Sequence, residues 1–556
     1  MDYKILEKLK TAYTLLKQGN FNEAKELCFE VIKAKQDIDG TANYFVGLCY
    51  LEDEQFNNAE FYFKNAVDIS EKDEFIYDLA FTYIASEKYE EAIKLYLRLY
   101  NKYPDEVDLN LKLAECYEKT DNPEKALVYY INNISLGNNG VEIIFKAGVV
   151  CKNLGKLDDA EYFYKLALNT MPENHLIYYN IGNLYYMKND FINALEWFEK
   201  AYYLEKNDTK VLNNIASSYY NIGELGIAEE FYIKFLRLSP EDPTAKLNLA
   251  CLLLLRQDYE NGLELYENRY DVDFYLKPEK KELPKPLFTS DKNNKDKIVY
   301  VYYEQGFGDT LNFARYLPVL ADMVKQVIFK SQKALYELIK DNFPNIKVIS
   351  DDINDSQLKY DCHISLVSLL KELKISKNNI ISPNGYLKPY GYKINMDLEE
   401  LFSFEGIKIG LCWNTGLAVN NRNIPFDKLK SIIDFSKNRI YSLQKGLGLE
   451  QIDTEEIIRL DPYLNSFYDT AGFIERMDLI ITVDTAVAHI AAAMNKPVYV
   501  LLNAVPDWRW GLDAETTPWY SSVGLIRQDY PNDWDSVIKK LAYKFKTGLI
   551  PFKEIN

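Results

Sequence analysis

A period of 34 residues runs through the first half of the chain and limits how it can fold. Small residues recur at spacings of 35, 33 and then 34 five times: Ala24, Ala59, Ala92, Ala126, Ala160, Ala194, Ala228 and Gly262. A second set of small residues precedes these by twelve positions: Ala12, Gly47, Ala80, Ala114, Gly148, Gly182, Ala216 and Ala250. Aromatic residues follow most of the first set by four positions: Phe63, Tyr96, Tyr130, Tyr164, Phe198, Tyr232 and Tyr266. The spacing predicts stacked pairs of antiparallel helices, in which small residues allow close approach and aromatic rings fill the gap to the next repeat.

This pattern resembles the tetratricopeptide repeat family over about residues 5–270, as eight units. The resemblance implies an all-α superhelix with a concave groove, whose usual role is to hold a peptide or protein. The repeats also explain the 45 tyrosines of the chain as packing residues. We therefore expect a protein or peptide partner in the groove.

Three asparagines occupy one repeat position in the last units: Asn180, Asn214 and Asn248. An amide can donate to and accept from a peptide backbone at once, so a ladder of amides suits an extended acceptor chain of any sequence. The family resemblance supports acceptor binding, because the repeat domain of O-GlcNAc transferases carries such a ladder. The alternative is that the asparagines recur only because a stacked array repeats its positions.

Composition narrows the partners and the compartment. A net charge of −18 argues against general nucleic-acid binding, which needs clustered Lys and Arg. The seven cysteines form no CxxC pair, which favours reduced thiols over a disulfide framework or a zinc site. No apolar run approaches the roughly 20 residues that span a bilayer, and the charged, amphipathic start is not a secretory signal. We expect a cytoplasmic protein without a transmembrane segment.

Strand-like and helix-like segments alternate in the second half. The first series contains KIVYVYYEQ (297–305), the helical LNFARYLPVLADMV (311–324), QVIFKS (326–331), IKVIS (346–350) and YDCHISL (360–366). The second series contains IKIGLCW (407–413), RIYSLQKG (439–446), MDLIITV (477–483) and PVYVLL (497–502). This alternation predicts parallel sheets with ligand sites at the carboxyl ends of the strands. Two such Rossmann-like, doubly wound halves match the α/β GT-B arrangement of glycosyltransferases.

Motifs in a fixed order extend this interpretation to function. They are QGFGDTLNFARYLP, GLCWNTG, SLQKG, DTAGFIERMDLIITVDTAVAHIAAAMNKPVYVLL and PDWRWG. Their order resembles bacterial tetratricopeptide-repeat glycosyltransferases, whose catalytic region is related to the heptosyltransferase family. The resemblance covers nearly the whole chain. It implies transfer of a sugar from a nucleotide donor to an acceptor, usually a protein in the repeat-bearing relatives, with flagellin among the suspected cases.

The expected organisation follows from these patterns. It comprises a repeat array at 1–270, a linker at 271–296, and two Rossmann-like halves at 297–395 and 396–556, the last binding the nucleotide-sugar. The linker contains a D-x-D sequence, Asp271 and Asp273, which marks a metal–diphosphate site in one class of glycosyltransferase. No buried strand leads into it, so we predict no metal site there.

Gly306, Gly308 and Asp309 follow the first strand of the α/β region. Glycines there let a ligand approach the backbone, and the helix that follows offers free N–H groups. An acceptor hydroxyl needs a carboxylate within hydrogen-bond reach, which makes Asp309 the candidate general base. The heptosyltransferases carry a G-D sequence at this strand end, with the aspartate in that role. The alternative is an aspartate that only caps its helix.

The sequence DTAVAH opens a later helix with Asp484 and Thr485. The amides of Thr485, Ala486 and Val487 are candidates to bind a diphosphate, and His489 lies one turn further on the same face. The heptosyltransferases have D-T-G-x-x-H here and use it for the donor, so Ala486 replaces a glycine that lies close to the ligand. From the residues alone, a capped helix with a packed histidine is the alternative.

Further candidates lie at other strand ends. For the donor they are Trp413, Asn414, Gln444 and Lys445, with Arg422 as a weaker candidate. Lys445 can neutralise phosphates, or it is a solvated turn lysine. Trp508, Arg509 and Trp510 form either a lid or an inter-domain packing plug. His363 is a candidate for the acceptor side, and His175 is expected to be a surface residue of a repeat loop.

Taken together, the sequence predicts a metal-independent, nucleotide-sugar-dependent glycosyltransferase without a cofactor, whose repeats recruit a protein acceptor such as flagellin or another surface protein. One alternative is a repeat scaffold whose GT-B region binds a nucleotide without catalysis. Another is a transferase directed to lipopolysaccharide, although a lipid-linked acceptor does not need eight repeats.

Overall fold

The computed structural model describes residues 3–138, 140–272, 283–354, 358–382, 384–394, 396–416, 422–434, 437–512 and 514–547. The chain divides into two compact units, Met1–Glu205 and Lys206–Asn556. Asp273 and the residues of the expected linker that follow it up to position 282 lie outside the described residues. Among the residues described, no helix is both long and apolar enough to cross a lipid bilayer.

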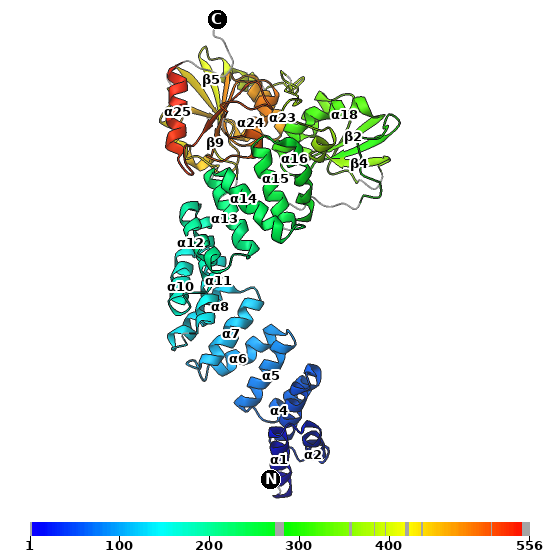
Figure 1. Ribbon diagram of the computed structural model, residues 1–556, viewed down its shortest axis with the longest axis vertical. Coiled ribbons are helices and arrows are strands. Elements are labelled where there is room, and N and C mark those ends of the chain that lie inside the picture. The colour runs from blue at the N-terminus through cyan, green and yellow to red at the C-terminus, as the bar shows by residue number, and fades with distance from the viewer. Residues whose placement is uncertain are drawn as a thin grey trace. The chain divides into compact units, whose positions relative to one another are not determined.

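The first unit consists of helices that pair in sequence order, α1 with α2 and so on to α11 with α12 (Figure 1). Their bounds are Tyr3–Lys17 (α1), Phe21–Lys33 (α2), Thr41–Glu52 (α3), Phe56–Ile69 (α4), Asp73–Ala85 (α5), Tyr89–Tyr100 (α6), Val107–Lys119 (α7), Pro123–Ser135 (α8), Val141–Asn153 (α9), Leu157–Thr170 (α10), His175–Met187 (α11) and Phe191–Leu204 (α12). Each pair is one repeat, so the predicted helical array is confirmed.

The repeat pattern has a direct steric cause. A Cβ atom added to Gly182 on α11 would lie 2.6 Å from the ring of Phe198 on α12. Gly148 and Tyr164 show the same relation at 2.7 Å. The aromatic ring therefore occupies a notch in the first helix of its own repeat, rather than only the gap to the next repeat. This contact requires a small residue sixteen positions before each aromatic.

The second unit begins with four further helices and a short 3-10 helix. They are α13 (Thr209–Ile222), α14 (Leu225–Leu238), α15 (Pro243–Leu255), α16 (Tyr259–Tyr266) and η1 (Glu267–Asp271). Residues of α15 and α16, including Leu252, Tyr259 and Tyr266, share one apolar core with the first sheet and with Trp508. The last repeats are thus packed into the α/β region.

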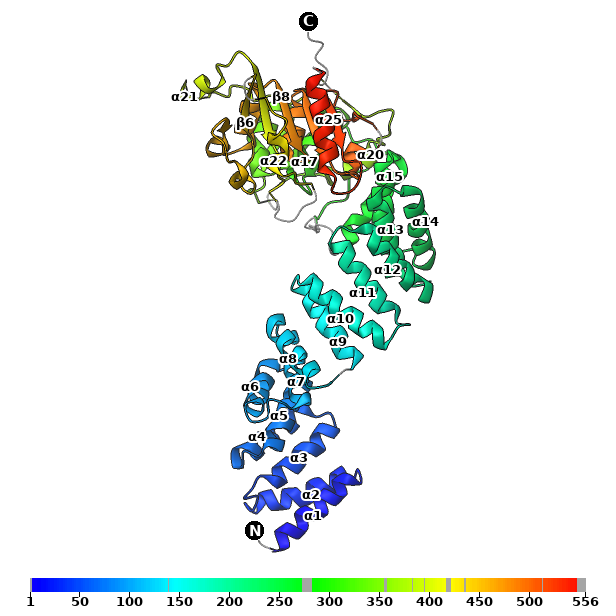
Figure 2. The same ribbon diagram turned by 90° about the vertical axis from the view of Figure 1, so that its left-hand side faces the viewer.

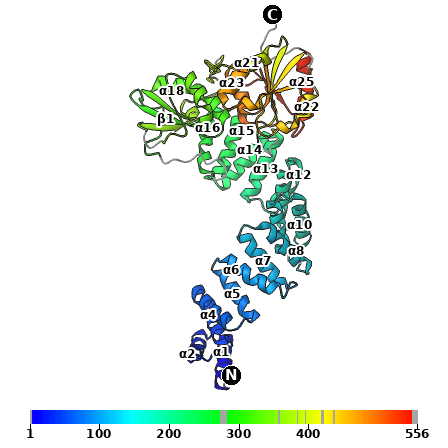
Figure 3. The same cartoon turned by 180° about the vertical axis from the view of Figure 1, so that it is seen from behind.

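A four-stranded parallel sheet that contains β1 follows (Figure 3). Its strand order is β3-β2-β1-β4. Its strands are β1 (Ile298–Tyr302), β2 (Gln326–Ser331), β3 (Lys347–Ser350) and β4 (Cys362–Ser365). Its helices are α17 (Phe307–Phe313), η2 (Ala314–Tyr316), α18 (Leu317–Met323), η3 (Lys333–Leu335), α19 (Tyr336–Asn342) and α20 (Ser368–Glu372).

The second sheet has six parallel strands in the order β10-β9-β8-β5-β6-β7. Its strands are β5 (Ile407–Cys412), β6 (Asn438–Ser442), β7 (Ile457–Arg459), β8 (Leu479–Val483), β9 (Val498–Leu502) and β10 (Val523–Arg527). The accompanying helices are α21 (Met396–Glu399), η5 (Glu400–Phe402), α22 (Phe426–Lys430), η6 (Leu449–Gln451), η7 (Asp461–Tyr463), α23 (Phe467–Glu475), α24 (Ala486–Ala493), η8 (Trp508–Trp510) and α25 (Trp534–Lys546).

The two faces of this sheet have separate cores. Helix α25 lies along one face of the sheet (Figure 2). Its Val537 and Leu541 belong to the same apolar core as Leu411 of β5. Ala488 and Ile490 of α24 pack with Ile480 of β8 on the other face. Helices therefore cover both faces, as in a doubly wound fold. The predicted fold class, an all-α repeat array followed by an α/β region with two parallel sheets, is confirmed.

Candidate functional site

A pocket of about 630 Å³ lies at the carboxyl ends of strands from both sheets. In the second sheet, connections run outward from β5 to β6 and β7, and β8 then returns to the other side of β5. Such a reversal leaves a crevice beyond the strand ends, where ligands bind in open α/β sheets. The pocket is lined by these predicted residues: Gly306, Gly308, Asp309, Asn414, Gln444, Lys445, Asp484, Thr485, Ala486, Val487, His489 and Arg509.

Asp309, in the first turn of α17, uses both of its carboxylate oxygens. Oδ2 accepts a hydrogen bond of 3.0 Å from the backbone N–H of Gly306, which caps the helix. Oδ1 forms an ion pair with Nη2 of Arg509. Burial raises the pKa of Asp309 to about 6, although the Arg509 cation acts in the opposite direction. The helix-capping alternative is thus observed, and it places the carboxylate in the pocket.

Arg509 joins the two halves of the α/β region. Its Nη1 donates to Asp507 Oδ1 at 2.7 Å, while Nη2 pairs with Asp309. Its guanidinium lies over the ring of Trp508, with the central carbon 4.4 Å from the ring centroid. Burial disfavours ionisation of Asp507, but Arg509 outweighs it, so the pKa of Asp507 is lowered. One guanidinium thereby pairs with two carboxylates that come from segments following strands of different sheets.

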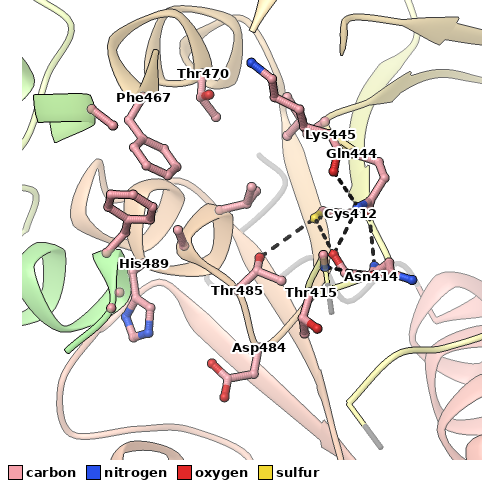
Figure 4. A pocket seen from close by; sticks show the side chains of 18 of the residues that line it. Cys412, Asn414, Thr415, Gln444, Lys445, Phe467, Thr470, Asp484, Thr485 and His489 are labelled. Carbon is pink, nitrogen blue, oxygen red and sulfur yellow. Dashed lines mark hydrogen bonds between the residues drawn. The ribbon is translucent and has the colours of Figure 1, made fainter. Parts of the chain in front are cut away.

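Helix α24 directs its N-terminus at the pocket. Thr485 is its N-cap residue and lines the pocket (Figure 4). Ala486 and Val487 line the pocket as well. Within the described residues, the Thr485 side chain makes no cap hydrogen bond; its hydroxyl lies 3.0 Å from that of Thr482. The first N–H groups of the helix therefore remain available to an anionic ligand.

Asp484 is nearly buried and pairs with Arg422, at 3.1 Å between Oδ2 and Nη1. Its pKa is raised by burial and by the negative charge of Asp507, against the effect of Arg422. The structure therefore gives Asp484 an ion-pair partner, whereas Thr485 occupies the cap position. Arg422, the weaker candidate in the sequence, lines the pocket.

His489 is a buried, neutral imidazole. Its Nδ1 lies 3.0 Å from the hydroxyl of Tyr520, and its ring stacks on Trp510 with the centroids 5.1 Å apart. Burial, helped by the nearby Arg509 cation, lowers its pKa to about 3. A Cβ added to Gly308 would lie 2.8 Å from His489 Cδ2, so the glycine at position 308 lets the two halves approach.

Gln444 bridges two loops of the pocket wall (Figure 4). Its Oε1 accepts from the backbone N–H groups of Trp413 and Asn414, at 3.1 and 2.9 Å. Its Nε2 donates to the carbonyls of Asn414 and Leu447, at 3.1 and 2.9 Å. The side chain that was predicted to contact the donor is thus engaged with backbone. Lys445, next along the chain, is exposed and donates to the carbonyl of Leu464.

The predicted tryptophans point into the protein. The indole of Trp413 is fully buried against Phe426, with ring centroids 4.7 Å apart, and does not line the pocket. Trp508 and Trp510 are buried as well, and Trp508 stacks on Phe313 of the other half. Their position is that of the packing plug, the second of the two alternatives from the sequence.

The predicted acceptor residues lie outside the pocket. His363 is buried on β4 beside Tyr302, with its N–H and carbonyl bonded to the segment at Pro286 and Phe288. Asn180 is half-buried and donates to the carbonyl of Leu176 in its own helix. Asn248 donates to the side chain of Asn213 at 2.7 Å. The third amide, Asn214, is half-buried on the same helix as Asn213.

Asp507 and the start of α23 are among the pocket residues that were not predicted from the sequence. Asp507 pairs with Arg509, and its negative charge raises the pKa of Asp484. Its position between β9 and a turn could have identified it as a site residue, because the carboxyl end of that strand borders the pocket. The start of α23 adds Ser466, Phe467 and Thr470. Phe467 contacts Phe307 of the other half, with ring centroids 4.8 Å apart.

Among the described residues, no group of three or more His, Cys, Asp or Glu is placed to hold a metal ion.

The comparisons with known proteins agree with this architecture. Residues 462–543 match the family described as glycosyltransferase family 9 (heptosyltransferase). Residues 40–73, 83–130, 176–208 and 209–242 match tetratricopeptide repeats. The chain thus combines segments similar to tetratricopeptide repeats with a segment similar to glycosyltransferase family 9.

Individual relatives differ in how much of the chain they match. Protein FlbA of Caulobacter vibrioides is 23% identical over 500 residues, covering 83% of this chain and 82% of FlbA. BBSome complex member BBS4 of Bos taurus is 24% identical over 48% of this chain, which spans about half (51%) of BBS4. A crystal structure of part of a TPR repeat-containing protein from Cytophaga hutchinsonii covers 43% of this chain and 99% of its own, at 16% identity and a TM-score of 0.37.

Proposed function

We propose that this protein transfers a sugar from a nucleotide-sugar donor to a protein acceptor held by its repeats. The observation that carries the proposal is that Asp309 and the N-terminus of α24 line the same pocket. One is a carboxylate suited to accept a proton, and the other is an anion-binding helix end. Together they provide the two groups that transfer of a sugar from a diphosphate requires.

The donor diphosphate would bind at the start of α24. The N–H groups of Ala486 and Val487 lie at the uncapped start of the helix, where the helix dipole favours a bound anion. Lys445 lines the same pocket and can reach a phosphate from its exposed turn. These groups would stabilise the leaving diphosphate as its negative charge develops. In the proposed reaction, the positive groups that stabilise the diphosphate belong to the protein itself.

Asp309 would take the proton of the acceptor hydroxyl. Its pKa of about 6 leaves it ionised at neutral pH but closer to the working range than an ordinary aspartate. Both oxygens are engaged, one by Gly306 and one by Arg509. Arg509 must release Oδ1 when the acceptor binds, and a donor phosphate would give it an alternative partner.

The test separates binding from transfer. Thermal stabilisation by UDP, GDP, ADP and CMP identifies the base of the nucleotide, and donor hydrolysis follows with the matching nucleotide-sugars. Asp309→Asn should reduce transfer by about 10²- to 10⁴-fold while it leaves nucleotide binding intact. Asp322→Asn, an exposed carboxylate on α18, is the matched control.

Nucleotide binding without hydrolysis or transfer would favour the scaffold alternative. The acceptor is tested by mass spectrometry of cellular proteins with and without the gene. Glycosylated lipopolysaccharide with unmodified proteins would assign the acceptor to a lipid-linked sugar instead.

A further inference from the structure

The last repeat ends against the segment that connects β1 to α17, the helix that carries Asp309. Tyr266 is the final residue of α16, and Arg269 lies in the 3-10 helix that follows; each is only 1% exposed. Both belong to the same compact unit as the pocket. Their side chains contact two consecutive residues, Glu304 and Gln305, which directly precede Gly306.

Arg269 holds Glu304 by two parallel hydrogen bonds. Its Nε and Nη2 donate to Oε2 and Oε1 of Glu304 at 3.1 and 2.7 Å, and both side chains are completely buried. Ser365 of β4 adds a third bond, from its hydroxyl to Glu304 Oε1 at 2.6 Å. A bidentate pair of this kind restricts orientation as well as distance. Glu304, which follows β1, is therefore held in place by a residue at the end of the last repeat.

Tyr266 holds Gln305. The Tyr266 hydroxyl accepts from Gln305 Nε2 at 3.0 Å. Gln305 has a φ of 62°, in the left-handed region that non-glycine residues rarely adopt. Such a conformation persists where surrounding contacts determine it. Gln305 lines the pocket, and its Oε1 lies 3.5 Å from Arg509 Nη2.

The equivalent tyrosine of the preceding repeat has another partner. Tyr232 lies 34 residues before Tyr266, and its hydroxyl is 3.1 Å from that of Ser217, in the same repeat. Tyr266 keeps the packing position of a repeat aromatic and adds a bond to the pocket wall. The hydroxyl thus has a role that repeat packing does not explain.

We propose that Tyr266 and Arg269 are positioning residues, through which the last repeat sets the backbone at Glu304–Gly306 and thereby the placement of Asp309 opposite Arg509. The repeat array would then be a structural part of the active site as well as an acceptor-holding surface. The kinetic part of this inference rests on the proposed function, whereas the structural part does not.

Tyr266→Phe in the full chain tests it, since the variant keeps the ring and loses the hydroxyl. Hydrogen–deuterium exchange of peptides covering 303–310 should be faster by about three- to tenfold, the effect of one lost hydrogen bond. The turnover number should fall by a similar factor, with KM for the donor unchanged. Tyr232→Phe is the matched control and should alter neither value.

A double-mutant cycle tests whether Tyr266 acts through Gln305. If Tyr266 acts through Gln305, Tyr266→Phe should have no additional effect on exchange or turnover in a Gln305→Ala background. Exchange in Tyr266→Phe that equals the Tyr232→Phe control would overturn the inference. If the wild-type protein shows no turnover, the proposed function fails. The exchange measurement still decides whether Tyr266 positions the backbone at Glu304–Gly306.

Discussion

Arg509 and Asp309 form an ion pair across the pocket, although 200 positions separate them in the chain. The arginine comes from the turn after β9 and the aspartate from the first turn of α17. Neither side chain is exposed enough for water to screen the pair strongly, at 8% and 15%. A residue from the turn after β9 therefore opposes the effect of burial on the pKa of the candidate base.

Removing Arg509 should shift the pH dependence of transfer. Burial raises the pKa of Asp309 to about 6, and Arg509 limits that rise. Since the base must be ionised, wild-type kcat/KM should fall as pH decreases below about 6. In Arg509→Met the pKa should rise further, by about one unit or more, so the acid limb moves to higher pH. A pH–rate profile measures it, and Arg256→Met, which removes an exposed pair with Glu229, is the control. An unshifted limb would contradict the pairing.

Gln444→Glu should destabilise the pocket wall. The amide nitrogen donates to the carbonyls of Asn414 and Leu447, and a carboxylate can only accept. The free energy of unfolding should fall by at least about 2 kcal/mol, as for a buried group facing acceptors. Gln451→Glu is the control, because Gln451 uses its side-chain oxygen to accept from the Phe426 N–H. Urea unfolding checks both, and equal midpoints would refute the bridging role.

His489 should make the protein sensitive to acid. Its pKa is about 3 in the folded chain and 6.5 as an unperturbed group. Between these values the unfolded chain binds a proton that the folded chain does not, so stability decreases as pH falls below 6.5. At pH 5 the loss should be about 2 kcal/mol. His489→Gln lacks this titration, so its unfolding free energy should change less between pH 8 and pH 5. Parallel pH profiles for the two proteins would be inconsistent with a neutral, buried imidazole.

Gly182→Ala should destabilise the repeats. The new methyl group would lie 2.6 Å from the Phe198 ring, and overpacking of this kind costs about 1–3 kcal/mol. Gly226→Ala, whose Cβ would meet only Arg256 at 3.9 Å, should be neutral or slightly stabilising, since alanine favours a helix. Thermal unfolding of both variants measures the difference. A Tm for Gly182→Ala at or above that of wild type would exclude the notch packing.

The fold was predictable because its signals are local. The helix pairs follow from the spacing of small and aromatic residues, and the pocket loops follow from glycines and aspartates after apolar strands. The burial of Trp413 could also have been predicted from the local sequence pattern. Side chains alternate along a strand, so Trp413 continues the face of Ile409 and Leu411, which is the core, while Cys412 faces the pocket.

The partners within the site were not predictable from local patterns. Gln444 was correctly placed at a strand end, yet its bonds to two neighbouring loops depend on how those loops meet. The contact between Tyr266 and Gln305 joins a repeat to a strand end across a segment with no periodicity. Such contacts arise from tertiary packing, which spacing in a single sequence does not encode.

The grouping of α13–α16 with the two sheets also bears on how such proteins diversify. Recombination that exchanged repeats at the end of the array, near residue 270, would cut through the contacts of Tyr266 and Arg269. A junction between Glu205 and Lys206 would keep them whole. Under the proposed function, duplication or loss of repeats before that junction would change the acceptor-binding surface and leave the contacts around the pocket intact. Chimeric proteins should therefore be joined there.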